Sequence, residues 1–92
     1  MLHIRYLLDV DGNKPFIELN LSEVDFFEEA FSHLKKKTGV FIDPYGDTRI
    51  YPDHQRIVID FLASNKDKTA IKLRDFFKTA SDKDEVLFAS GD

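Results

Sequence analysis

The fold is decided by the stretch IELNLSEVDFFEEAFSHLKKKTG, residues 17–39, because the apolar period changes within it. Ile17, Leu19 and Leu21 alternate with polar residues, which is the period of a half-buried strand. Farther along, apolar residues recur at the three- and four-residue spacing of an amphipathic helix. They are Val24, Phe27, Ala30, Phe31 and Leu34. A strand that leads directly into such a helix predicts a fold of class α+β.

Local signals place the two ends of this helix. Ser22 is a good N-cap, and the acids that follow it suit the positive end of the helix dipole. Lys35–Lys37 lie at the negative end, and Gly39 is a natural C-cap. The sequence therefore predicts one helix over Glu23–Lys37, and it assigns the lysines to the helix end rather than to a nucleic-acid contact.

A β-hairpin is expected before this stretch. Apolar and polar residues alternate along most of residues 2–10, and residues 11–15 are Asp-Gly-Asn-Lys-Pro, which is turn chemistry throughout. The strand at Ile17–Leu21 then returns beside the first one. The hairpin is the N-terminal part of a small, mostly antiparallel sheet.

Two more helices and three short strands are expected after residue 39. One helix begins at Pro52, which suits a first helical turn, and the other is capped by Thr69. Short apolar runs at Val40–Ile42, Arg49–Tyr51 and Val86–Phe88 predict the remaining strands. The aromatic residues expected in the core are Phe27, Phe31, Phe61 and Phe76.

Length and composition limit the class of protein. The 92 residues are enough for one domain, 1–92, and too few for two. Because there is no cysteine, disulfides and the common structural zinc sites are excluded, and a secreted domain of this size would usually need them. No apolar run approaches the roughly 18 residues of a membrane span. We therefore expect a cytoplasmic protein that does not bind a membrane.

Charge is concentrated in one part of the chain. The formal net charge is −4, but the segment Asp9–Glu29 alone carries seven acids and one base, Lys14, which gives −6. This balance argues against nucleic acid as the main ligand. It predicts an acidic surface that faces a basic partner, and the alternative is an ordinary solvated surface. From this segment we assign Asp11, Glu18, Asp25, Glu28 and Glu29 to partner binding.

The segment Phe41–Pro52 is the second candidate for a binding site. Pro44 and Gly46 predict a specific turn that holds Tyr45 at its tip. Aromatic side chains on a rigid turn flanked by charges are typical of a protein-binding hot spot. The alternative is a plain connection in which the tyrosine packs on the domain. The partner-binding residues assigned here are Asp43, Tyr45, Asp47, Arg49 and Tyr51.

No local pattern of residues favours catalysis or metal binding. The three histidines are widely separated, and the chain has neither Gly-x-Ser-x-Gly nor a phosphate-binding glycine-rich loop. The sequence therefore predicts a protein that is not an enzyme and that needs no metal and no cofactor. The enzyme alternative is a small hydrolase that uses Asp43, Asp47 and His54.

Residues Ile42–Arg49, ahead of an amphipathic helix in a short acidic chain, resemble the small bacterial immunity proteins that neutralise delivered toxins. Such proteins cap a toxin domain, often a basic nuclease, with an acidic surface. The resemblance implies an inhibitor of a basic toxin domain, and it assigns no individual residue. The alternative is a small regulatory or adaptor module that binds another cytosolic protein or self-associates. The sequence leaves the oligomeric state open.

Overall fold

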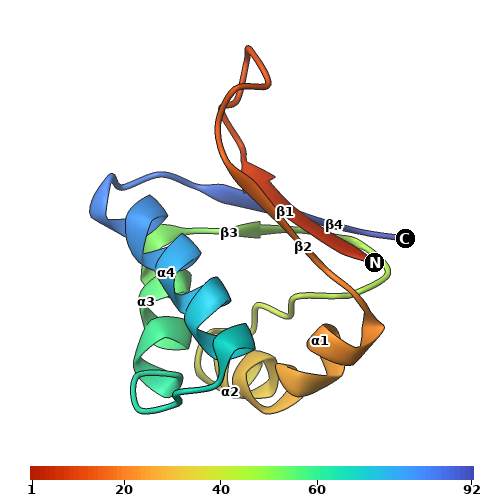
Figure 1. Cartoon of the computed structure of the whole chain (residues 1–92), viewed down its shortest axis with the longest axis vertical. Coiled ribbons are helices and arrows are strands. Elements are labelled where there is room, and N and C mark those ends of the chain that lie inside the picture. Colours follow the sequence, from red (N-terminus) through yellow and green to blue (C-terminus); the bar gives the residue numbers. More distant parts are fainter.

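An antiparallel sheet forms one layer of the computed structural model, which describes residues 1–92, and four helices cover one face of it (Figure 1). The strands lie in the order β2-β1-β4-β3, so β2 and β3 are the edges. The first and last strands of the chain therefore pair at the centre of the sheet, and the α+β class is confirmed. The strands are β1 (Leu2–Tyr6), β2 (Phe16–Leu19), β3 (Asp47–Ile50) and β4 (Leu87–Gly91).

Alternation along the strands explains why only one sheet face is covered. In β1, Leu2, Ile4 and Tyr6 are buried against the helices, whereas His3 and Arg5 lie on the opposite face. Successive side chains of a strand point to opposite faces, so every strand divides its residues in this way. The other buried strand residues are Leu19, Ile50, Leu87 and Ala89.

The helices are α1 (Leu21–Phe26), α2 (Glu28–Thr38), α3 (Pro52–Phe61) and α4 (Lys68–Asp82). The prediction of one helix over Glu23–Lys37 was wrong, because the chain bends at Phe27 between α1 and α2. Phe27 has φ −92° and ψ 6°, and its ring is fully buried and stacks on Phe31 at 5.7 Å. Burial of this ring fixes the bend, and the helices number four rather than three.

The N-cap of α1 is Asn20, not Ser22 as the sequence predicted. The Glu23 N–H donates to Asn20 Oδ1 at 2.9 Å, and the Asn20 N–H donates to Glu23 Oε1 at 3.0 Å. This reciprocal pair is a capping box, which satisfies two N–H groups at once and therefore outcompetes a cap at Ser22. Gly39 closes α2 in the left-handed conformation with φ 81°, as expected.

The N-cap of α4 also differs from the prediction. Asp67 takes this position in place of Thr69, whose own N–H donates to Asp67 Oδ1 at 2.8 Å. A carboxylate accepts this bond more strongly than a hydroxyl does. Pro52 does occupy the first turn of α3, as predicted.

The strand predicted at Val40–Ile42 is absent. Ile42 is fully buried in the core, and the Thr48 hydroxyl donates to the Phe41 carbonyl at 3.1 Å. This segment therefore gives its apolar side chain to the core without pairing in the sheet. The sheet uses Asp47–Ile50 instead, which begins two residues before the predicted strand Arg49–Tyr51.

The core is one cluster of 19 buried apolar residues between the sheet and the helices. Phe27 and Phe31 belong to it as predicted, and Phe76 packs against it while partly buried. Placing Phe61 in the core was wrong, because its side chain is 41% exposed at the edge of α3. Phe77, the next residue along α4, is fully buried.

One polar side chain lies inside the core and connects three elements. Gln55 of α3 is fully buried, and its Nε2 donates to the carbonyls of Ile50 at 2.8 Å and Glu85 at 2.9 Å. These two carbonyls belong to the end of β3 and to the approach to β4. The amide therefore holds α3 at a fixed position under the sheet.

No helix of the structure has both the length and the apolar composition needed to cross a bilayer.

Candidate protein-binding site

The turn at residues 43–46 presents Tyr45 to solvent. Asp43 Oδ1 accepts from the Tyr45 N–H at 2.9 Å, and the Asp43 carbonyl accepts from the Gly46 N–H at 3.3 Å. The Tyr45 side chain is 71% exposed, so it does not pack on the domain. Asp43 therefore shapes the turn through its carboxylate and its carbonyl, and Tyr45 is the side chain that the turn displays.

The last strand holds this turn in place. The Gly91 N–H donates to the Gly46 carbonyl at 2.9 Å. A Cβ atom added at Gly91 would lie 2.0 Å from the carbonyl oxygen of Pro44, a distance that no side chain can occupy. The absence of a side chain at this position allows β4 and the turn to approach each other so closely. Tyr45 thus stands on a turn whose backbone is fixed on both sides.

A pocket of about 240 Å³ opens beside the turn, between α1, α2 and residues 41–44. Its floor is apolar, because it is formed by Val24, Phe31 and Ile42, which all belong to the core. Phe41, which is 43% exposed, and Pro44 form the wall on the side of the turn. The pocket therefore offers a small apolar surface next to the exposed tyrosine.

Two acidic residues line this pocket, Asp25 from α1 and Glu28 from the first turn of α2. Both residues are exposed, and neither side chain makes an ion pair or a hydrogen bond within the chain. Glu23 differs from them, since it completes the capping box and pairs with Lys72 at 3.3 Å. The chain thus leaves two negative charges uncompensated at the rim of an apolar pocket.

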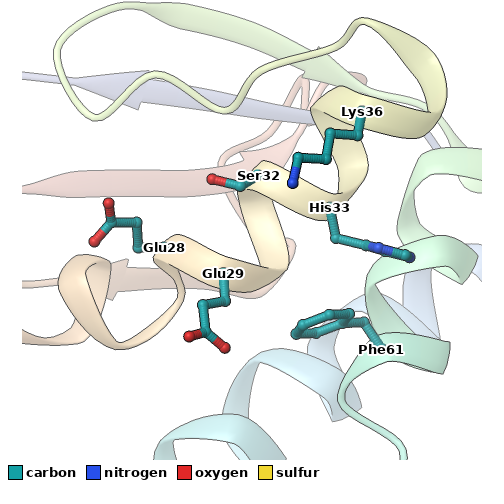
Figure 2. A pocket seen from close by; sticks show the side chains of 6 residues that line it. All are labelled: Glu28, Glu29, Ser32, His33, Lys36 and Phe61. Atoms are coloured by element: carbon teal, nitrogen blue, oxygen red, sulfur yellow. The ribbon is translucent and has the colours of Figure 1, made fainter.

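A second, shallower depression of about 440 Å³ lies between α2 and α3 (Figure 2). The His33 ring lies over the Phe61 ring, with centroids 4.8 Å apart, and so covers part of the phenylalanine, which remains 41% exposed. Glu29 points to the Phe61 side of α2 in this view, whereas Glu28 points away from it. Glu28 lines both depressions, so they meet at this residue.

The remaining acids of the segment Asp9–Glu29 do not join this site. The loop between β1 and β2, which carries Asp11, extends beyond the sheet, away from α1 and α2 (Figure 1). Glu18 lies on the outer face of the sheet, opposite His3 in the register of β1 and β2. The acids of this segment therefore occupy separate parts of the surface, and Asp25, Glu28 and Glu29 lie together on α1 and the first turn of α2.

The other predicted residues of the segment Phe41–Pro52 lie in β3 or directly after it. Asp47 and Arg49 are exposed on the outer face of the sheet. Tyr51 precedes α3 at the far end of the strand and packs edge-on against His54, with centroids 5.7 Å apart. The strand thus separates Tyr51 from the Tyr45 turn, and the structure brings only Asp43 and Tyr45 next to the pocket.

One exposed surface was not expected from the sequence. On the outer face of the sheet, the pairing register places Phe16, Arg5, Phe88 and Arg49 in one row across all four strands. The Arg5 guanidinium lies 5.0 Å from the centroid of the Phe88 ring, and Phe16 is 62% exposed. The alternation of single strands indicates which residues face outward, but only the register shows that these four form a row.

The residues of the hydrolase alternative lie apart. Asp47 begins β3 and Asp43 lies in the turn before it, whereas His54 lies past the end of the strand, where its Nδ1 accepts from the Tyr51 N–H at 3.2 Å. No group of three or more His, Cys, Asp or Glu residues is close enough to hold a metal ion. The site near Tyr45 offers apolar contact and negative charge.

Comparison with models of known protein families gave no match, and neither curated protein sequences nor solved structures showed a significant similarity to the chain.

Proposed function

We propose that this chain is a protein-binding module that caps a basic protein partner, in the manner of a small immunity protein. The observation that carries this proposal is the pocket beside Tyr45, where Asp25 and Glu28 stand without partners at the rim of an apolar floor. Protein-binding hot spots combine buried aromatic or aliphatic anchors with charge that is complementary to the partner. In this proposal the carboxylates and the apolar groups have different tasks.

The carboxylates serve the encounter between the two proteins. Exposed charges of one sign act at a distance, raise the association rate and suppress wrong partners. Asp25, Glu28 and Glu29 are all exposed and are adjacent on α1 and α2. They provide a local negative field that a basic surface would meet first.

The apolar groups serve the lifetime of the complex. Tyr45 is exposed on a turn that is already ordered, so little conformational entropy is lost when it enters a partner. Phe41 adds a second exposed aromatic ring a few residues away. We take the partner to be a delivered toxin domain and the site of action to be the cytoplasm, since an inhibitor of this kind acts where its toxin acts.

A differential capture experiment tests the proposal. The tagged protein is incubated with lysate of its native organism and of competing strains, and bound proteins are quantified by mass spectrometry. The variant with Asp25→Lys and Glu28→Lys is compared with a variant of equal charge change, Asp11→Lys with Asp75→Lys, whose sites are exposed elsewhere. We expect a basic protein that the wild type and the control variant retain and that the pocket variant loses. Equal capture by both variants would reject the site.

The outer face of the sheet favours a second candidate function, self-association. Phe16 is 62% exposed at the edge strand β2, next to Arg5. Exposed apolar side chains at an unpaired edge are typical of surfaces that pair with another chain. Sedimentation velocity over a range of concentrations tests this candidate, because a dimer through this face should be lost in Phe16→Ser. A monomer at all concentrations would reject it.

A further inference from the structure

We infer that the pocket between α1, α2 and residues 41–44 binds a single arginine side chain of the partner. This inference rests on the proposed function, because it names the group through which the partner is recognised. It is drawn from three properties of the pocket, which are its size, its floor and the arrangement of its carboxylates.

The size of the pocket fits one long side chain. Its volume of about 240 Å³ lies below the range of about 300–1,000 Å³ that is typical of sites for cofactors and drug-sized ligands. The backbone around it is fixed, because the Asp43 turn and the contact between Gly91 and Gly46 hold the wall that contains Pro44. The pocket therefore suits a side chain that is presented by another protein.

The floor and wall favour a side chain with an apolar stem and a flat cationic head. Val24, Phe31 and Ile42 provide aliphatic and aromatic contact for methylene groups. The Phe41 ring accepts a cation already, since Lys35 Nζ of the same chain lies 5.1 Å from its centroid. A guanidinium stacks on aromatic faces and is more weakly hydrated than an ammonium, so it loses less when it enters such a pocket.

The two carboxylates at the pocket favour a guanidinium over an ammonium. Asp25 and Glu28 flank the bend at Phe27, so they approach the pocket from two different helices. A guanidinium has five N–H donors in a planar fork and can donate to two carboxylates at once, whereas an ammonium acts as a point charge. Both carboxylates are unpaired within the chain, so neither has to leave another partner first.

The inference is tested with small probes and the full chain, so that no partner is needed. N-acetyl-arginine amide is titrated into ¹⁵N-labelled protein, and N-acetyl-lysine amide and N-acetyl-norleucine amide serve as the matched ammonium and neutral probes. We expect saturable shifts of the amides of Val24, Glu28 and Ile42 with the arginine probe at millimolar concentration, and weaker or no shifts with the other two. Equal response to lysine or norleucine would overturn the choice of arginine.

Substitutions locate the probe. Asp25→Asn and Glu28→Gln should each weaken binding by about two- to fivefold, the range expected for partly exposed charge pairs. Glu29→Gln is the matched control, because it removes the same charge from the neighbouring position that lines the other depression. An equal loss in Glu29→Gln would overturn the inference, since the probe would then respond only to general negative charge.

The outcomes separate this inference from the proposed function. Capture of a basic protein that depends on Asp25 and Glu28, together with no saturable arginine binding, would reject the arginine pocket and leave the proposed function standing. Saturable arginine binding without any captured protein would support the pocket and count against a capping function.

Discussion

At the scale of single residues, Gly91 decides where the Tyr45 turn lies. A Cβ atom at this position would overlap the Pro44 carbonyl at 2.0 Å, and backbone cannot move aside as a flexible side chain can. We expect Gly91→Ala to lower the free energy of unfolding by about 1–3 kcal/mol, as overpacking does. Urea unfolding measures this change, and the amide shifts of Tyr45 and Gly46 report the displacement of the turn. Ser90→Ala, on the outer face, is the control, and an unchanged turn in Gly91→Ala would contradict this account.

The Tyr6 phenol makes stability depend on pH in the alkaline range. Burial, and then the negative charge of Glu85, raise the pKa of Tyr6 above its ordinary value. Because the folded state holds the proton more tightly than the unfolded state, the stabilisation is fully present below about pH 10 and is lost as pH rises through the folded pKa.

We expect the free energy of unfolding of the wild type to fall above about pH 10 relative to that of Tyr6→Phe, which has no phenol to ionise. Urea unfolding of both proteins from about pH 8 to about pH 11 measures the difference. Parallel curves for the two proteins over this range would show that Tyr6 does not titrate in the folded state as described.

At the scale of secondary-structure elements, α1 depends on its capping box. Asn20 satisfies the Glu23 N–H, and Glu23 satisfies the Asn20 N–H in return. Asn20→Ala should therefore lower the free energy of unfolding by about 0.5–2 kcal/mol. Ser22→Ala is the matched control, because Ser22 is exposed within the helix and caps nothing. A larger loss in Ser22→Ala than in Asn20→Ala would restore the cap that the sequence suggested.

Two phenylalanines on neighbouring helices differ in burial, so their substitution should affect stability differently. Phe31 is 2% exposed and stacks on Phe27, so Phe31→Ala should lower the free energy of unfolding by about 3–5 kcal/mol. Phe61 is 41% exposed and contacts His33, so Phe61→Ala should cost clearly less. Denaturant midpoints of both variants measure the contrast. Equal losses of stability would mean that the depression between α2 and α3 is part of the core.

At the scale of the whole molecule, charge and apolar contact should affect different rate constants. Glu28→Lys should slow association with the captured partner, and the effect should shrink as salt rises, because exposed charges are screened beyond about 8 Å at physiological ionic strength. Tyr45→Ala should speed dissociation with little salt dependence, since it removes an anchor worth roughly 2 kcal/mol or more.

Association and dissociation rates measured at two salt concentrations decide this prediction. Asp11→Lys is the control for charge, because the β1–β2 loop that carries it extends away from α1 and α2. If Glu28→Lys leaves the association rate unchanged, the carboxylates at the pocket are only a solvated surface. If Asp11→Lys slows association equally, the steering comes from net charge and not from this site.

The sequence by itself determined the class of the fold and much of its local structure. Alternation along residues 2–10 and the turn residues that follow predicted the β1–β2 hairpin. Helical spacing predicted α3 and α4, and it predicted helical structure over Glu23–Lys37, which the structure divides at Phe27. Pro44 and Gly46 predicted a turn with an exposed Tyr45. These features depend on contacts between residues that are near one another in the chain, so their signals are local.

Only the tertiary structure decided which residues form the site. Phe27 bends the chain because its ring enters a core built by distant elements, and that bend places Asp25 and Glu28 on two helices. Ile42, which was predicted to lie in a strand, is buried in the core instead and forms part of the floor of the pocket. Asp11, equally acidic in the sequence, lies in the separate β1–β2 loop (Figure 1). Packing between distant segments fixes these positions. The residues next to a position in the sequence do not predict this packing.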